Sequence, residues 1–202
     1  MDTQSAVTKA LDLFHEHGGM LRTGEALALG IHPRTLYALR DAGQLQRLSR
    51  GVYRLADAPP LAYPDLVSVA YQVPQGVICL ISALSFHDLT TQVPHVVDVA
   101  LRRGARRPAV IYPPVRFFWF SEPAWQAGSA EQRLDGVAVR LYAPAKTVAD
   151  CFKYRHKLGL DIAVEALRRL VRRSDFQAPT LLEYARVCQV ETIIRPYLEA
   201  LL

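Results

Sequence analysis

Residues 22–55 constrain the fold more than any other part of the chain, because several short elements with clear boundaries follow one another there. An apolar helical pattern ends at Gly30, and Pro33 opens a second helix that stops at Gly43. Proline suits the first turn of a helix, and glycine suits the position just past its end. Two β-type runs follow within residues 45–55 and are joined by the turn sequence SRG. This order of helix, tight turn, helix and hairpin predicts a winged helix-turn-helix, a module that binds DNA.

The second helix of this segment is the expected recognition helix. Leu36 and Leu39 share its apolar face, and Arg34 lies on the opposite side in the first turn, where arginine binds guanine edges through two hydrogen bonds. Arg40 falls near the apolar side, so we expect it to brace the domain or to contact a phosphate. A helix start with a hydroxyl cap also suits a phosphate. The expected DNA contacts are therefore Arg34, Thr35 and Tyr37 on this helix, Arg22 and Thr23 at the start of the preceding helix, and Arg47, Arg50 and Arg54 on the hairpin.

The composition is that of a folded protein with a basic surface. Hydrophobic residues make up 50% of the chain and charged residues 21%, with a net charge of +5 and a sequence pI of about 9.3. This balance favours an anionic partner such as nucleic acid. The three cysteines are far apart and fit neither a disulfide framework nor a zinc site. With no signal sequence and no apolar run of membrane-spanning length, we expect a cytoplasmic protein without a metal, a cofactor or a membrane partner.

The pattern of elements divides the chain into three parts. Residues 1–57 form the winged helix-turn-helix, residues 58–76 a linker and connecting helix, and residues 77–202 a C-terminal domain. In that domain, apolar runs predict strands in a small, mostly antiparallel sheet, over residues 77–80, 96–101, 110–112, 115–120 and 137–142. Helices are expected after the strands, over residues 145–156, over 162–173 with Asp161 as N-cap, from a capping box at Thr180–Glu183 onward, and over 191–201. The fold class is α+β, with a winged helix-turn-helix followed by a mixed sheet-and-helix C-terminal domain.

No motif indicates an enzyme, since glycine-rich phosphate loops and a nucleophile elbow are absent from the sequence. Asp98 on a predicted strand suggests a metal-dependent nuclease, but the next strand carries Arg116 and aromatic residues instead of a second acid and a lysine. We expect His87 to be a hydrogen-bonded helix cap. Lys146 and Asp150, four residues apart, are expected to form an ion pair on a core-facing helix. The alternative for Asp150 is a partner-binding or switch role.

Two clusters have more than one interpretation. Residues 117–120 (FFWF) fit a core or an oligomer edge better than a base-stacking platform, because such platforms alternate with basic residues and only Arg116 is near. Four arginines near the end of the helix over residues 162–173 complement the helix dipole. Their side chains are explained by exposure to solvent, by an extension of the DNA-binding surface or by contact with an acidic partner. The four residues are Arg168, Arg169, Arg172 and Arg173.

Three sequence blocks resemble one known family. They are LQRLSRGVYRL at residues 45–55, SALSFHDLT at 82–90 and PAKTVADCF at 144–152, the last followed by KLGLD at 157–161. In this order they resemble the AbiEi-type antitoxins of type IV toxin–antitoxin systems. The resemblance implies a repressor that binds double-stranded DNA at inverted repeats upstream of its own operon. It also implies a C-terminal antitoxin domain and, as a partner, a nucleotidyltransferase-like toxin.

The sequence therefore favours a DNA-binding transcriptional repressor of the antitoxin type, which autoregulates its operon by promoter occlusion and counteracts a toxin. The alternative is a protein-interaction module that binds a toxin or another partner directly, with DNA binding secondary. A metal-dependent DNA-cleaving enzyme that uses Asp98 is the third hypothesis.

Overall fold

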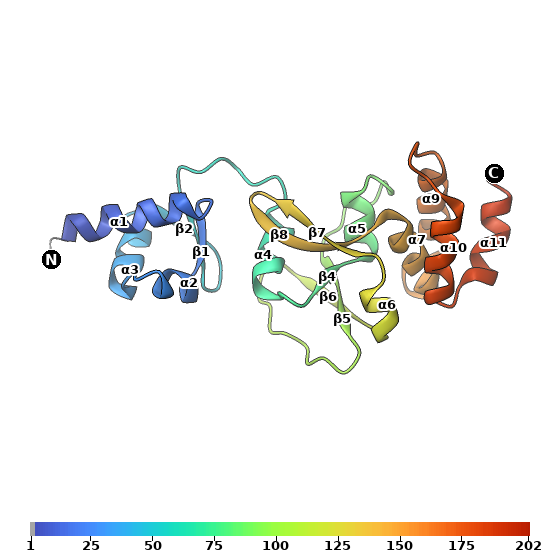
Figure 1. The fold of residues 1–202 in the computed structure, drawn as a ribbon, viewed down its shortest axis with the longest axis horizontal. Helices are drawn as coiled ribbons and strands as arrows, with labels where there is room; N and C mark the ends of the chain where they lie inside the picture. The colour runs from blue at the N-terminus through green and yellow to red at the C-terminus, as the bar shows by residue number, and fades with distance from the viewer. Residues whose placement is uncertain (1–2) are drawn as a thin grey trace. The chain divides into compact units, whose positions relative to one another are not determined.

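The computed structural model describes residues 3–202, which form two compact units divided between Tyr71 and Gln72. The last residue of helix α4 (Pro64–Gln72), which Figure 1 labels, is the first residue of the second unit. We call these parts unit 1 and unit 2. The protein contains helices and two separate sheets, so its class is mixed α and β, as the sequence predicts. Among residues 3–202, every helix is too short or too polar to cross a bilayer.

Unit 1 contains three helices and a three-stranded antiparallel sheet before α4. The elements are α1 (Thr3–Glu16), β1 (Met20–Arg22), α2 (Thr23–Ala28), α3 (Pro33–Asp41), β2 (Leu45–Ser49) and β3 (Val52–Leu55). The sheet order is β1-β3-β2, so β3 is the central strand. The helices α2 and α3 and the hairpin were predicted, whereas β1 is too short to show a period in the sequence.

The ends of α2 and α3 follow from local backbone chemistry. The Ile31 N–H donates to the Ala26 carbonyl over 2.9 Å, and the Gly30 N–H donates to the Leu27 carbonyl over 3.0 Å. Glycine fits because this termination needs a positive φ, which is +88° at Gly30 and +73° at Gly43, the matching position after α3. These paired bonds satisfy carbonyls that the helix leaves open and fix the sharp turn between α2 and α3.

The core of unit 1 forms where the apolar faces of α1 and α3 meet the sheet. Phe14 and Leu36 are fully buried, and Leu39, Ile31 and Tyr53 are nearly so. Burying each such side chain contributes about 1.5–3 kcal/mol to stability. The helical-wheel prediction for α3 is confirmed, because its two leucines face the core and its polar side chains stay outside.

Unit 2 is a five-stranded sheet with its helices packed on and beyond it (Figure 1). The first half contains β4 (Val77–Ile78), α5 (Leu80–Phe86), β5 (Val97–Arg102), β6 (Val115–Phe120), α6 (Glu122–Gln126), β7 (Ser129–Leu134) and β8 (Val137–Tyr142). The second half is helical, with α7 (Pro144–Lys153), α8 (Arg155–Leu158), α9 (Leu160–Val171), α10 (Ala178–Val187) and α11 (Glu191–Glu199).

The prediction of a mostly antiparallel sheet is wrong. The strand order is β6-β5-β4-β8-β7, in which β5 pairs with β6 and β4 pairs with β8 in parallel, while the other two pairs are antiparallel. Parallel neighbours need a long connection. Residues 103–114 provide one between β5 and β6, and β5 to β7 with their connections separate β4 from β8.

Three local predictions for unit 2 are also corrected. Residues 110–112 form no strand, because prolines at positions 108, 113 and 114 remove backbone donors and Ile111 is 80% exposed. The N-cap of α9 is Gly159, so Asp161 lies inside the first turn. The helix α10 begins at Ala178, because Pro179 is accommodated in its first turn, and Thr180 is therefore no N-cap.

The helix α7 lies at the centre of unit 2. Each of its residues from Lys146 to Phe152 is buried. It packs against α5, α9 and α10, and its apolar side chains join the main core with the aromatic residues of β6 and β8. A helix buried on every side has no solvent-facing stripe, so the polar residues that it carries must find partners inside the protein.

A glycine against α7 gives a direct test of this packing. Gly128 has a φ of +66°, and a Cβ there would lie 2.8 Å from the Lys146 Cβ, whereas Gly136 has a φ of +81° and open space around it. We expect Gly128→Ala to destabilise unit 2 by about 2–4 kcal/mol and Gly136→Ala by about 1–2 kcal/mol, the second being the backbone cost alone. Both tryptophans, Trp119 and Trp125, lie in unit 2, so tryptophan fluorescence during urea unfolding measures its stability. Equal losses in the two variants would show that the close approach to α7 does not matter.

Candidate nucleic-acid interface

The exposed face of α3 carries the side chains that the sequence assigns to base contact. Arg34 is exposed and Tyr37 is 42% exposed, while Thr35 is half-buried on the flank. The helix begins at Pro33, and its N-cap, His32, accepts a hydrogen bond from the Arg34 N–H through Nδ1 over 3.2 Å. Among residues 3–202, Arg34 has no ion-pair partner, so its guanidinium remains available to an external acceptor.

Arg40 lies at the other end of α3 and is held within the helix. Its guanidinium forms an ion pair with Asp41 at 2.6 Å and lies 5.2 Å from the centre of the Tyr37 ring. The contact with Tyr37 braces one of the predicted base-contacting side chains. This arrangement agrees with the bracing role expected for Arg40.

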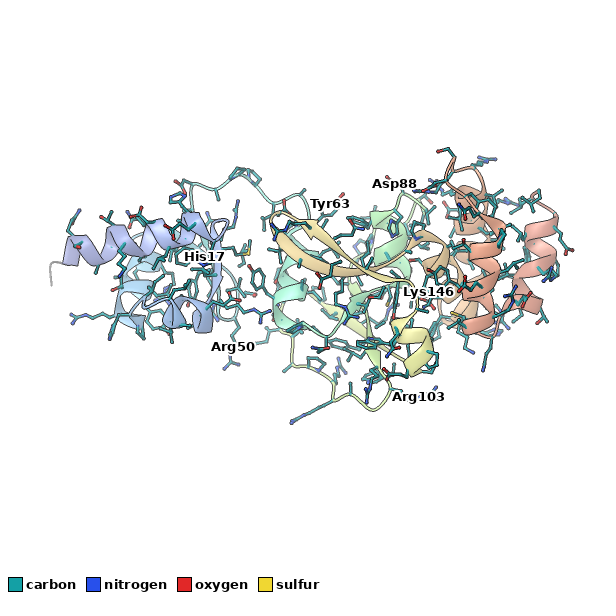
Figure 2. The ribbon with its side chains drawn as sticks, viewed as in Figure 1. His17, Arg50, Tyr63, Asp88, Arg103 and Lys146 are labelled. Atoms are coloured by element: carbon teal, nitrogen blue, oxygen red, sulfur yellow. The ribbon has the colours of Figure 1, made fainter. Side chains whose placement is uncertain are left out.

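The hairpin of β2 and β3 presents two exposed arginines. Arg50 lies at the turn, where Gly51 has a φ of +74°, and Figure 2 marks its side chain. Arg47 lies on β2 and donates from Nε to the Ser49 carbonyl over 3.2 Å. The pairing of β2 with β3 is irregular between Arg47 and Ser49. A bulge here increases the local twist and keeps β2 from forming a flat edge.

Arg54 occupies a different position from the one expected. It lies on the central strand β3, is only 8% exposed, and its Nη2 donates to the Pro59 carbonyl. The guanidinium therefore ties the chain after the hairpin to the sheet. Contact with a DNA phosphate needs an exposed cation, so we leave Arg54 out of the surface proposed below.

Arg22 and Thr23 lie at the start of α2, where the sequence predicts contacts with a DNA phosphate. Their backbone N–H groups instead form hydrogen bonds within unit 1. Arg22 is the N-cap, and its N–H donates to the Glu25 Oε2 over 2.7 Å. Thr23 is the first helical residue, and both its N–H and its hydroxyl contact the Gly51 carbonyl, at 2.8 and 3.3 Å. A carboxylate thus already occupies this helix start, and Thr23 instead holds the hairpin turn against α2.

The four arginines predicted on the helix over residues 162–173 divide into two kinds. The helix α9 ends at Val171, so Arg172 is its C-cap and Arg173 follows it. Arg169 pairs with Glu165 at 3.1 Å, and Arg173 pairs with Asp175 at 2.9 Å. Arg168 and Arg172 are exposed and form no ion pair within residues 3–202. Only these last two cations remain available to DNA or to an acidic partner.

The predicted ion pair of Lys146 and Asp150 is confirmed, but it is buried and not on the surface. Lys146 Nζ lies 2.7 and 2.6 Å from the two Asp150 oxygens. It also lies 4.0 Å from the centre of the Tyr142 ring, and the Cys188 thiol donates to Asp150 Oδ1 over 3.2 Å. Figure 2 marks Lys146 on α7. Burial raises the pKa of the Asp150 carboxyl, and the Lys146 ammonium opposes that rise.

Asp98 and Arg116 form a second polar centre, between β5 and β6. Arg116 Nε donates to Asp98 Oδ1 over 2.8 Å and Nη2 to Oδ2 over 3.0 Å, while the Ile81 N–H also reaches Oδ2. Burial raises the pKa of Asp98, and the bonds from Arg116 oppose the rise. Both Asp98 carboxylate oxygens accept hydrogen bonds from within the protein. Residues 3–202 contain no cluster of three side chains that could bind a metal ion. These contacts give no support to the nuclease hypothesis.

His87 is a hydrogen-bonded cap, as predicted. It follows the last residue of α5, and its Nε2 lies 2.8 Å from the Tyr142 carbonyl. Burial lowers the pKa of its imidazole, and the nearby positive charge of Arg173 contributes. The ring thus joins the end of α5 to β8 in its neutral form.

The comparisons with known proteins concern the N-terminal part of the sequence and the fold of the chain. The family model described as "Transcriptional regulator, AbiEi antitoxin" matches residues 9–56, which confirms the resemblance over most of unit 1. No curated protein matches the chain. The crystal structure of the RV2827C protein from Mycobacterium tuberculosis aligns with a TM-score of 0.58 and 12% identity, covering 94% of this chain and 79% of that chain. At this identity the likeness concerns the fold alone.

The buried ion pair predicts strongly unequal effects of single and double substitutions. Lys146→Met leaves the Asp150 carboxyl buried without its cation, and we expect it to destabilise unit 2 by about 3–5 kcal/mol. Adding Asp150→Leu removes the orphaned carboxyl and should recover a large part of that loss. Arg186→Met, which breaks the exposed pair with Glu191, is the control and should cost at most about 1 kcal/mol. Urea unfolding followed by tryptophan fluorescence measures all three, and additive losses in the double variant would contradict the coupling.

The lowered pKa of His87 predicts a pH dependence of stability. Between that pKa and the unfolded value of about 6.5, the unfolded chain binds more protons than the folded one. The free energy of unfolding therefore rises with pH across this window, and unit 2 should lose stability as the pH falls below about 6.5. In the His87→Gln variant, we expect the free energy of unfolding to fall less as the pH drops below about 6.5. Urea unfolding curves measured over a pH series give this free energy. An unchanged pH dependence in the variant would rule out His87 as its source.

Proposed function

We propose that this protein is a DNA-binding transcriptional repressor of the antitoxin type, and that unit 1 is its winged helix-turn-helix. The observation that carries the proposal is the exposed polar face of α3, with Arg34 in its first turn and the basic turn of the hairpin in the same unit. The order α1, β1, α2, α3, β2, β3 supports it, because this module places one helix in the major groove and a hairpin on the backbone. The family match over residues 9–56 is described as a transcriptional regulator.

In this mechanism the two parts of unit 1 have different tasks. Arg34 reads a base pair, where a bidentate contact with guanine gives about 1–3 kcal/mol of discrimination. Thr35 and Tyr37 flank it on α3. Arg47 and Arg50 contact phosphates, which give affinity and register without reading sequence. Arg22 contributes at the edge of this surface, and the hydroxyl of Thr23 acts indirectly, by positioning the hairpin turn.

The antitoxin role extends the proposal to the rest of the chain. Residues 58–76 act as a linker and connecting helix, and residues 77–202 as the antitoxin-like domain. Two of the three family-like blocks form α5 and α7, the helices at the centre of unit 2. The repressor would bind inverted repeats upstream of its own operon and counteract a nucleotidyltransferase-like toxin.

The test is an anisotropy titration on the DNA upstream of the gene and on random DNA, at low and high salt. We expect Arg34→Ala to weaken specific binding by about 1–3 kcal/mol and random binding far less. Arg50→Ala should weaken both alike and reduce the slope of log K against log salt by about one. Arg133→Ala, which removes an exposed cation from β7, is the control for net charge.

Equal losses on both DNAs for Arg34→Ala would reject its role in base reading. Binding that is weak, unspecific and abolished at high salt would reject the repressor itself. A partner protein recovered in a stoichiometric complex, with that weak DNA binding, would favour the alternative of a protein-interaction module.

A further inference from the structure

The edge strand β6 brings together aromatic rings and cations that are distant in the sequence. The five-stranded sheet ends at β6, and the arginine-rich loop of residues 103–114 folds back beside it. The end of α7 adds a tyrosine and a lysine to the same region. We call this the β6 surface, and it comprises Arg103, Arg107, Phe117, Trp119, Lys153 and Tyr154.

The aromatic side chains of this surface are held rigidly. Trp119 is 39% exposed, and its Nε1 donates to the Ala105 carbonyl over 2.9 Å, which fixes the indole against the loop. The Phe117 ring lies 6.4 Å from it, and the Arg107 guanidinium carbon lies 5.7 Å from the centre of the Phe117 ring. A fixed, partly exposed indole beside a guanidinium loses little conformational entropy when a flat group stacks on it.

Tyr154 anchors the second half of the surface. Its ring stacks on Phe120 with a centroid distance of 5.4 Å and an interplanar angle of 18°. It meets Phe118 edge-to-face at 5.1 Å. The Lys157 ammonium lies 5.8 Å from the centre of the Tyr154 ring. Because successive side chains of a strand point to opposite faces of the sheet, Tyr154 lies with Phe118 and Phe120 on the face of β6 opposite to Phe117 and Trp119. The β6 surface therefore extends around the free edge of the sheet.

The region around β6 carries several exposed cationic side chains, and most of them form no ion pair. Arg102 is neutralised by Glu122 at 3.1 Å. The other exposed cations here form no ion pair within residues 3–202, and they are Arg103, Arg106, Arg107, Lys153 and Lys157. Unpaired cations in such a group raise the local concentration of an anionic polymer.

A cavity of about 180 Å³ lies at the end of β6, on the side of Phe120 and Tyr154. Arg103, Lys153, Trp119 and Tyr154 line it, and Asp150 lies at its inner wall. Figure 2 marks Arg103 on the loop after β5. Since this volume is below the roughly 300–1,000 Å³ of small-molecule sites, it suits one base of a longer ligand. The Asp150 carboxylate is neutralised by Lys146, so it does not repel a ligand that carries phosphates.

We propose that the β6 surface binds a single-stranded polynucleotide. Its phosphates contact Arg103, Arg107 and Lys153 along the free edge of β6. Its bases stack on Trp119 on one face of the strand, and a further base enters the cavity on the other face. Single strands are bound in this way by other proteins, through a basic groove with aromatic platforms. A duplex gains less here, because its bases are already stacked on one another. This activity belongs to unit 2 and does not depend on the DNA-binding role proposed for unit 1.

The experiment uses the full chain and a labelled oligonucleotide as single-stranded RNA, as single-stranded DNA of the same sequence and as a blunt duplex. Trp119→Ala should raise the Kd for single strands by about 5- to 100-fold, the range of one lost stacking contact, and Trp119→Phe should keep most of the affinity. Lys153→Gln should reduce the slope of log K against log salt concentration by about 0.7, which is the contribution of one phosphate contact on a single strand. Arg133→Gln, an equal charge change on β7, should leave binding unchanged.

Three results would overturn the proposal. These are equal affinity for the duplex, unchanged single-strand binding in a folded Trp119→Ala protein, and loss of single-strand binding in Arg34→Ala instead. Quenching of tryptophan fluorescence by the bound strand, present in the wild type and reduced in Trp119→Phe, supports stacking on this indole. Tighter binding of the RNA strand assigns the ligand to RNA through its 2′-hydroxyls, and tighter binding of the DNA strand assigns it to single-stranded DNA. Equal binding shows that the surface binds single strands without reading the sugar.

Discussion

The buried ion pair of Lys146 and Asp150 is the interaction on which unit 2 depends. It lies on a helix whose residues from 146 to 152 are all buried, and it joins that helix to the Tyr142 ring of β8 and to Cys188 after α10. Removing charges from water costs several kcal/mol per ion, which only good geometry and further hydrogen bonds offset. The two short bonds, the aromatic faces and the thiol donor supply that compensation together. The pair therefore connects α7 to the sheet and to the end of α10 at one buried point.

The sequence predicts this pair but not its burial, and the reason is physical. Lys146 and Asp150 share one face of α7, while Val148, Cys151 and Phe152 occupy another, which is the pattern of an ordinary amphipathic helix. Groups on other elements cover this polar face, namely the rings of Phe120 and Tyr142 in the sheet and the thiol of Cys188 after α10. The strands of unit 2 are predictable for a similar reason, because each has its own apolar run. Their order and direction are not, because parallel pairing depends on long connections.

Unit 1 is predictable almost throughout, because its boundaries are set by local chemistry. Proline at the start of α3 and glycines after α2 and α3 specify these elements within a few residues. The roles of Arg54 and Thr23 could not be predicted in the same way. Arg54 lies on a strand with neighbours on both sides, where every residue is buried and the alternation of inward and outward side chains is lost. Thr23 is committed to a hairpin turn that lies 28 residues further along the chain.

The distribution of unpaired cations is more informative about partners than the net charge of +5. Several arginines, such as Arg116 and Arg173, are bound to carboxylates and add little to the outer field. Among residues 3–71, the exposed cations without an ion pair are Lys9 on α1 and three arginines on α3 and the hairpin, Arg34, Arg47 and Arg50. These exposed guanidinium groups suit the regular phosphates and base edges of a duplex. Those beside β6 are set among fixed aromatic rings, which suit bases that are not already stacked. The two units share a preference for anionic polymers, but the side chains around the cations differ, and that difference leads us to assign them different forms of nucleic acid.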